Sequence, residues 1–98
     1  MLPFDDVNAP LYTVGQVASM LGLQAAFLRR LDTEAVVQPA RSDGGQRRYS
    51  RADIAVVQQV WSMAGEGMTL PGIRRILELE AEVASLRAQL RRAKNPTK

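Results

Sequence analysis

Residues 41–51 read Arg-Ser-Asp-Gly-Gly-Gln-Arg-Arg-Tyr-Ser-Arg, and this stretch decides the fold that we predict. The run Asp43-Gly44-Gly45 favours the tight turn of a β-hairpin, because glycine reaches positive φ without a Cβ clash. Arginines lie on both sides of that turn. Their guanidinium groups carry a permanent charge and a planar fork of donors that suits phosphate oxygens and guanine edges. The stretch therefore predicts a projecting basic hairpin, and a solvated loop without a partner is the alternative.

Two short helices are predicted just before the hairpin. The first begins at a capping box formed by Thr13 and Gln16 and ends at Gly22, where left-handed backbone geometry is commonly needed. The second is predicted over residues 25–35. Apolar residues at helical spacing would face one another: Val14, Val17, Ala18 and Leu21 on the first helix, Leu28, Leu31 and Ala35 on the second. Two short helices joined by a three-residue turn are typical of a helix-turn-helix.

Strand and cap signals complete the small domain. Residues 36–39 combine β-branched side chains with a proline, which favours a short edge strand, and residues 46–49 would be its return partner. The Ser-x-x-Asp pattern that begins at Ser50 predicts a third helix over residues 51–64, with Trp61 as its core anchor. The predicted fold class is mainly α with a small β-hairpin wing, that is, a winged helix-turn-helix followed by a C-terminal dimerisation helix.

A fourth helix is predicted after a cap at Thr69, with Pro71 tolerated in its first turn. From residue 73 to about residue 94 the sequence has neither glycine nor proline. Apolar residues recur there at alternating spacings of three and four, at Ile76, Leu79, Val83, Leu86, Leu90 and Ala93. This is a coiled-coil seam, and an isolated helix of this length is only marginally stable in water. We therefore expect dimerisation through the first five seam residues, and a single solvated helix is the alternative.

The charges beside the seam leave the orientation of the pair open. Glu82 with Arg87 would suit a parallel pair, whereas Glu80 with Arg87 would suit an antiparallel one. The predicted organisation is a flexible tail over residues 1–10, a winged helix-turn-helix over 11–75, a coiled-coil helix over 76–94 and a disordered tail over 95–98.

The second predicted helix carries the candidate contacts to bases. In a helix-turn-helix this helix enters the major groove with its N-terminal residues nearest the base edges. Gln24 could pair with adenine, and Ala25 or Phe27 could touch a thymine methyl group. Arg29 or Arg30 could bind phosphate or guanine. For Phe27, a place in the core is the alternative.

Composition limits the possible functions. Residues 1–40 hold two basic and four acidic residues, whereas residues 41–98 hold eleven basic and six acidic ones. This local basic excess predicts a polyanionic partner, double-stranded DNA. The absence of cysteine and histidine excludes disulfides and the common metal sites, so we expect no metal and no cofactor. Nothing in the sequence offers acid–base or nucleophilic chemistry, so we do not expect an enzyme.

Targeting signals are missing from the sequence. No stretch reaches the length of a membrane span, and the first residues lack the basic and apolar regions of a signal peptide. We therefore expect a cytoplasmic, nucleoid-associated protein.

Residues 11–80 resemble, in the order and spacing of their motifs, the DNA-binding domain of MerR-family transcription regulators. The matching segments are Tyr12-Thr-Val-Gly-Gln-Val-Ala, the Gly22 turn, Phe27-Leu28-Arg29, Asp32, Val36-Val37-x-Pro39-x-Arg41, Gly45-x-Arg47-x-Tyr49, Asp53-Ile54 and Gly67-x-x-Leu70-x-x-Ile73. The run from Gly44 to Ser50 and the uninterrupted helix from Ile73 to Leu90 are most similar to the HspR-like, heat-shock-repressor branch.

The resemblance implies a homodimer with an antiparallel C-terminal coiled coil, recognition helices in successive major grooves and wings on the flanking backbone. It implies backbone contacts from Arg29, Arg41, Arg47 and Tyr49. With the base-contacting candidates, the predicted DNA-binding set is Thr13, Gln24, Ala25, Phe27, Arg29, Arg30, Arg41, Arg47, Arg48 and Tyr49. The chain departs from the family pattern at Leu31, usually aromatic, at Ala35, usually glycine, and at Gln46, commonly tyrosine. Arg30 and Arg48 could compensate for these departures.

Regulation is expected to differ from that of effector-sensing relatives. Metal sensors of the family place cysteines at the start of the coiled coil, and drug sensors append a ligand-binding domain, and this sequence has neither. We therefore expect regulation by protein abundance, by cooperative assembly on DNA or by a protein co-regulator, which in the heat-shock branch is a chaperone.

Three functional classes remain open. The first is a sequence-specific transcription regulator, repressor or activator, that binds inverted repeats. The second is an architectural, excisionase-like DNA-binding protein that bends DNA and assembles cooperatively on direct repeats. The third is a protein-interaction module that uses the coiled coil, and it predicts no salt-dependent affinity for DNA.

Overall fold

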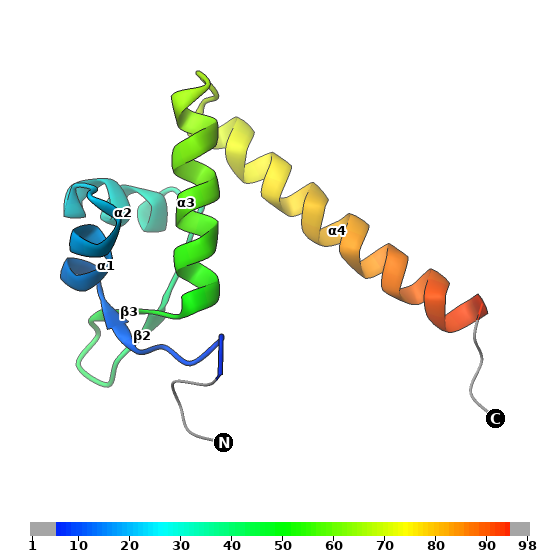
Figure 1. The fold of residues 1–98 in the computed structure, drawn as a ribbon, viewed down its shortest axis with the longest axis horizontal. Coiled ribbons are helices and arrows are strands. Elements are labelled where there is room, and N and C mark those ends of the chain that lie inside the picture. Colours follow the sequence, from blue (N-terminus) through cyan, green and yellow to red (C-terminus); the bar gives the residue numbers. More distant parts are fainter. Residues whose placement is uncertain (1–5, 95–98) are drawn as a thin grey trace.

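The computed structural model of the protein describes residues 6–94 and is mainly helical, with one small antiparallel sheet (Figure 1). The helices are α1 (Val14–Leu21), α2 (Ala25–Thr33), α3 (Arg51–Gly65) and α4 (Leu70–Lys94). The strands are β1 (Tyr12–Thr13), β2 (Ala40–Arg41) and β3 (Arg47–Tyr49). This confirms the predicted winged helix-turn-helix followed by a long C-terminal helix. Of the predicted tails, residues 1–5 and 95–98 lie outside the described residues.

Residues 6–10, the described part of the predicted N-terminal tail, are bonded to the domain. The backbone carbonyl of Val7 accepts a hydrogen bond from the amide of Ala52 at 3.0 Å. Ala52 lies in the first turn of α3, where backbone amides have no partner within the helix. Just after this segment, the amide of Leu11 donates to the carbonyl of Tyr49 at 3.1 Å. This segment therefore makes a backbone contact with α3 that its lack of an apolar period did not indicate.

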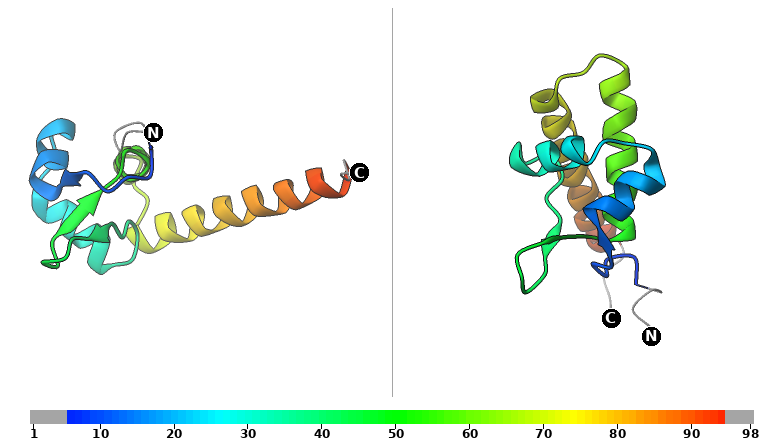
Figure 2. Two further views of the ribbon diagram at one scale, coloured as in Figure 1. Left: turned by 90° about the horizontal axis from the view of Figure 1, so that it is seen from below. Right: turned by 90° about the vertical axis from the view of Figure 1, so that its left-hand side faces the viewer.

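The sheet has the strand order β1-β3-β2, with both neighbouring pairs antiparallel. Tyr12 pairs with Tyr49, and Arg41 pairs with Arg47. Strand β1 was not predicted, because a strand of two residues is too short to show an alternating pattern. The hairpin of β2 and β3 is the predicted wing, and its turn projects from the domain (Figure 2).

The predicted strand over residues 36–39 is wrong, since β2 occupies Ala40–Arg41 instead. The amides of Val36 and Val37 both donate to the carbonyl of Leu31, at 2.8 and 3.2 Å, and so close the end of α2. The side chain of Val37 is buried in the core, and Pro39 is buried as well. The β-branched pair therefore serves to end a helix and to anchor the following turn.

Helix boundaries follow the predicted caps. The hydroxyl of Thr13 accepts a hydrogen bond from the amide of Gln16 at 3.1 Å, and the Gln16 side chain accepts one from the amide of Thr13 at 2.9 Å. Ser50 and Asp53 form the same reciprocal box at the start of α3. Gly22 ends α1 with φ 66°, in the left-handed region that glycine adopts without a Cβ penalty.

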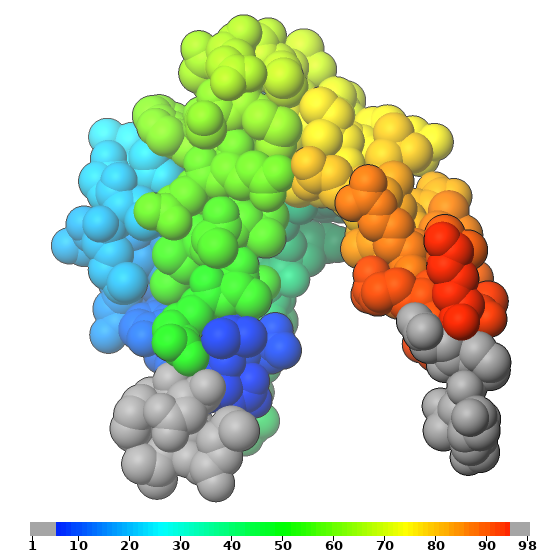
Figure 3. Space-filling view, turned by 45° about the vertical axis from the view of Figure 1, so that its right-hand side comes forward, coloured from blue at the N-terminus to red at the C-terminus, as the bar shows by residue number. Residues whose placement is uncertain are grey.

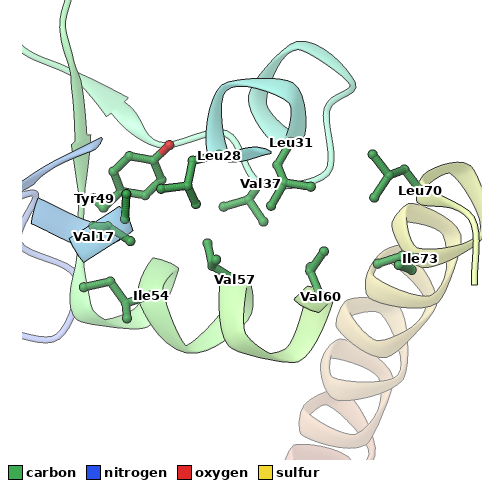
Figure 4. Close-up of a cluster of buried hydrophobic side chains, with 11 residues drawn as sticks. Val17, Leu28, Leu31, Val37, Tyr49, Ile54, Val57, Val60, Leu70 and Ile73 are labelled. Atoms are coloured by element: carbon green, nitrogen blue, oxygen red, sulfur yellow. The ribbon is translucent and has the colours of Figure 1, made fainter. Parts of the chain in front are cut away.

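One hydrophobic core lies where α1, α2, α3, the end of β3 and the start of α4 meet (Figure 4). Its most deeply buried side chains are Val17, Leu28, Leu31, Tyr49, Val57, Val60 and Ile73. Burial of one large aliphatic side chain contributes about 1.5–3 kcal/mol. The mutual packing of these side chains therefore sets the orientation of α2 relative to α3.

Trp61 is not the core anchor that the sequence analysis predicted, because its side chain is 53% exposed. Helix α3 turns Val57 and Val60 toward the core, and the residue after Val60 lies about 100° further round the helix. The Trp61 ring instead packs edge-on against Phe27 of α2, with 5.3 Å between ring centroids. This aromatic pair links α2 and α3 outside the core.

Helix α4 joins the domain by its first turns only. Leu70 and Ile73 are buried, and the amide of Gly72 donates to the hydroxyl of Thr69 at 3.2 Å, as the predicted cap requires. The Gln59 side chain of α3 donates to the Glu80 carboxylate at 3.0 Å. Beyond this point α4 leaves the rest of the molecule, and its C-terminal part stands clear of the surface (Figure 3).

The end of α2 is strained. The helix ends at Thr33, two residues earlier than predicted, and Ala35 adopts φ 59°. Among the non-glycine residues that the structure describes, Ala35 alone has a positive φ. A left-handed alanine costs roughly 1–2 kcal/mol because Cβ approaches the following carbonyl oxygen. Ala35 is exposed, so it does not extend the buried side of α2 as the sequence analysis predicted.

Replacing Ala35 with glycine should stabilise the protein. The Ala35→Gly substitution removes the Cβ clash, and part of this gain is lost to the greater freedom of glycine in the unfolded chain. We expect the free energy of unfolding to rise by about 1 kcal/mol, measured by urea denaturation. Ala26→Gly, inside α2, is the matched control and should destabilise the protein by a similar amount. Loss of stability in Ala35→Gly would contradict the strain assigned to this position.

Candidate nucleic-acid interface

A basic hollow of about 410 Å³ lies between the wing and the helix-turn-helix. The residues that line it are Thr13, Val14, Arg29, Arg41, Gly45, Gln46, Arg47 and Arg48. Five members of the predicted DNA-binding set, one threonine and four arginines, therefore meet around one concave surface. Strands β2 and β3 supply three of these arginines, and α2 supplies Arg29. We call this surface the basic hollow.

Two of the four arginines are paired with one carboxylate that the sequence analysis did not assign to the site. Oδ2 of Asp32, in the last turn of α2, lies 2.8 Å from Nη2 of Arg41 and 2.7 Å from Nε of Arg47. The Asp32 side chain is only 9% exposed. The three charges leave one net positive charge, so the pairing lowers the charge of the hollow without cancelling it. In the sequence, only the match to the MerR-family motifs had singled out Asp32.

The other two arginines keep their charge available. Arg29 is exposed and makes no ion pair or side-chain hydrogen bond within residues 6–94. Arg48 is partly buried, and its Nη1 donates to the carbonyl of Arg47 at 3.1 Å and to the Gln46 side chain at 3.4 Å. Both of these acceptors are uncharged, so neither arginine is neutralised.

The exposed side of α2 differs from the predicted one at three residues, Ala25, Ala26 and Phe27. Gln24, the residue before the helix, is exposed and makes no side-chain cap. Ala25 and Phe27 are partly buried and pack against the core, so the alternative for Phe27 describes its position better. Ala26, which the sequence analysis passed over, is exposed and lies one helical turn before Arg29 and Arg30. Because Leu28 and Leu31 face the core, the helical repeat of α2 places Ala26 on the opposite, exposed side.

Arg30 lies on the same exposed side of α2 but outside the basic hollow. Its Nε lies 2.6 Å from the carboxylate of Glu34, four residues later. This pair is largely exposed and so contributes little to stability. Arg30 can therefore exchange Glu34 for another anion at small cost.

Tyr49 does not lie on the surface, contrary to the place that the family resemblance implies. Its side chain is 1% exposed and belongs to the core (Figure 4). Its hydroxyl is buried and has no hydrogen-bond partner among the described residues. Burial raises the pKa of the Tyr49 hydroxyl, which the positive charge of Arg47 partly opposes. Tyr49 is therefore a core residue that supports β3.

The seam of α4 forms a second surface. A groove of about 400 Å³ runs along it, lined by Ile76, Leu79, Glu80, Val83, Ala84 and Arg87. Four predicted dimerisation residues, Leu79, Val83, Leu86 and Leu90, are exposed, and Ile76 is partly buried. Glu82 does not line the groove.

The described helices include none that is long and apolar enough to cross a membrane.

Comparison with known proteins identifies the family. The model of the MerR HTH family regulatory proteins matches residues 12–80. The chain is 41% identical over 83 residues to the putative heat shock protein HspR of Streptomyces coelicolor, an alignment that covers 84% of this chain and 55% of that protein. The chain spans about half the length of the curated relatives it matches.

Solved structures agree with this assignment. The N-terminal part of MtaN, the multidrug transporter activator of Bacillus subtilis, superposes with a TM-score of 0.64 at 30% identity, covering 85% of this chain and 84% of that one. HiNmlR, described as a MerR-family regulator lacking the sensor domain and bound to promoter DNA, superposes with a TM-score of 0.65 at 25% identity, covering 85% and 73%. Since the family model matches well over half of the chain, the chain belongs to the MerR family of helix-turn-helix regulatory proteins.

Proposed function

We propose that this protein is a sequence-specific transcription regulator that binds double-stranded DNA as a homodimer. The observation that carries the proposal is the convergence of Arg29, Arg41, Arg47 and Arg48 on one concave surface beside the exposed side of α2. Such a surface matches the sugar–phosphate backbone, and the adjoining helix matches the width of a major groove. The promoter-bound state of the related HiNmlR supports the same use.

Each part of the interface has a proposed task. The N-terminal half of α2 enters the major groove, where Gln24 and Ala26 lie nearest the base edges. Arg29 and Arg48 hold phosphates on either side of the groove, and the hairpin turn lies along the neighbouring backbone. The similarity to the heat-shock-repressor branch favours repression by occupation of a promoter in the cytoplasmic nucleoid. A protein co-regulator is the favoured source of control.

Selection of bound duplexes from a random pool tests this function directly, and Arg29→Ala tests the surface. If a dimer makes about eight phosphate contacts, the logarithm of affinity should fall with the logarithm of salt concentration with a slope of roughly −7. Arg29→Ala should weaken binding to every sequence and flatten the slope by about one for each subunit. Fluorescence anisotropy with the selected duplex measures both quantities.

Arg92→Ala is the matched control, because Arg92 lies in the last turn of α4 and not in the basic hollow. It should leave the slope unchanged. Equal effects of the two substitutions would refute the proposed surface. The arrangement of the selected half-sites separates the classes of DNA-binding protein: inverted half-sites support the symmetric regulator, and tandem half-sites support the architectural alternative.

The proposed dimer is an antiparallel pair of α4 helices. The groove along the seam includes both Glu80 and Arg87, the pair that suits an antiparallel arrangement. Glu82, which a parallel pair would use, lies outside that groove. In the antiparallel register, Val83 of each copy packs beside Leu86 of the other, and Glu80 faces Arg87 of the second copy on both sides of the twofold axis.

Charge reversal tests the orientation of the pair. Glu80→Arg and Arg87→Glu should each weaken the dimer, because each places like charges opposite one another twice. The double substitution should restore the dimer, since the pair is then inverted. Analytical ultracentrifugation over a dilution series measures the dissociation constant, and we expect about a tenfold change for each single reversal.

Glu82→Arg is the control for the opposite orientation. An antiparallel pair should tolerate it, whereas a parallel pair should dissociate. A dimer weakened by Glu82→Arg and rescued by the further change Arg87→Glu would overturn the antiparallel proposal. Val83→Asp should give monomers in either orientation, because it places a charge in the seam.

Tyr49→Phe separates a core role from a role in DNA binding. The substitution removes a buried hydroxyl that has no described partner, so we expect the free energy of unfolding to stay level or to rise by about 1 kcal/mol. Affinity for the selected duplex and its salt slope should not change. A fall in affinity with unchanged stability would return Tyr49 to the DNA-binding surface.

A further inference from the structure

Asp32 occupies the junction between the recognition helix and the wing. It lies in the last turn of α2, and one oxygen of its carboxylate, Oδ2, accepts hydrogen bonds from both Arg41 and Arg47, at 2.8 and 2.7 Å. These arginines belong to β2 and β3, the two strands of the hairpin. One side chain of α2, the proposed base-reading helix, therefore bonds to both strands of the wing.

The link extends to the turn of the hairpin. Nη1 of Arg41 donates to the carbonyl of Gly45 at 3.1 Å, while Nη2 of the same guanidinium holds Asp32. The turn itself is closed by short backbone bonds, including one from the amide of Ser42 to the carbonyl of Gln46 at 2.7 Å. Strands of two and three residues are too short to be stable as an isolated hairpin. The wing therefore depends on bonds to the rest of the domain for its position.

We propose that Asp32 is a positioning residue for DNA recognition, which fixes the wing arginines relative to the base-reading side of α2 before DNA binds. This inference rests on the proposed function. Phosphate attraction depends on the number of positive charges, whereas sequence discrimination depends on where the base-reading residues are held. Asp32 lowers the positive charge of the basic hollow and in exchange holds two guanidinium groups in place.

Both arginines keep donors for DNA while they hold Asp32. A guanidinium has five N–H groups, and Arg47 uses only Nε for the carboxylate. Arg41 uses one N–H on each of its terminal nitrogens, and its side chain is 48% exposed. The Asp32 carboxylate and a phosphate group can therefore bind the same guanidinium on different edges. The internal pairing prepares these arginines for phosphate and does not remove them from the interface.

The test compares Asp32→Asn with Asp43→Asn in the full 98-residue chain. Both substitutions remove one negative charge near the wing, but Asp43 is exposed at the hairpin turn and makes no described ion pair. Two probes are used: a duplex selected by the wild-type protein from a random pool, and a scrambled duplex of the same composition. Binding to each is measured by fluorescence anisotropy across a range of salt concentrations.

For Asp32→Asn we expect the ratio of affinities for the two duplexes to fall about tenfold or more. Affinity for the scrambled duplex should not fall, and its salt slope should become steeper by about one for each subunit, because the released arginines can follow any phosphate. Asp43→Asn should keep the ratio of the wild-type protein. A ratio that stays at the wild-type value in Asp32→Asn would overturn the inference, as would equal losses on both duplexes, which indicate a purely structural role.

Arg41→Lys is the second test variant, to be used if Asp32→Asn does not fold. Lysine keeps the positive charge but cannot bond to Asp32 and Gly45 with a fixed fork. It should lower the ratio of affinities and speed hydrogen exchange at the amides of Ser42 and Gly45, whereas Arg92→Lys, outside the basic hollow, should do neither. Failure of the wild-type protein to discriminate between the duplexes would overturn the proposed function and this inference together. Wild-type discrimination that survives in both Asp32→Asn and Arg41→Lys would overturn the inference alone.

Discussion

The packing of Leu28 and Leu31 against α3 is the constraint on which the rest of the structure depends. The chain is near the lower size limit for a domain with its own core, so one cluster of side chains must orient the helices and the wing together. Because α2 buries these two leucines, its opposite side is the one that faces outward. The same burial brings Asp32 to the wing, since it follows Leu31 directly. The position of the basic hollow is therefore a consequence of how the core packs.

Local signals were sufficient to predict much of this arrangement. The capping boxes at Thr13 and Ser50 and the left-handed Gly22 depend on residues within one helical turn, so the sequence displays them completely. The seam of α4 could also be predicted, because the alternating spacing of its apolar residues extends over more than two heptads. The hairpin and α2 were both predicted to contact DNA through arginines, and three arginines of the hairpin do line one hollow together with Arg29 of α2.

The errors arose where helix closure, helical phase or tertiary contacts decide the structure, and not residue composition. Val36 and Val37 have the composition of a strand, but their amides close α2 through Leu31. Trp61 is one position away from the buried side of α3, a difference that apolar character alone does not resolve. The pairing of Asp32 with Arg47 spans fifteen residues and depends on the hairpin register, so no pattern of spacing indicates it. The family resemblance supplied Asp32 but also carried over a surface role for Tyr49, whose ring is buried.

The attachment of α4 has a mechanical consequence. Only the first turns of this helix are buried, yet about 30 Å of helix follow Ile73 at 1.5 Å per residue. A tilt of about ten degrees at that attachment would move the far end by roughly 5 Å. In a dimer joined along these helices, the same tilt would move each winged helix-turn-helix relative to the other. The distance between the two recognition helices would then change in response to small forces at the junction of α3 and α4, far from any base.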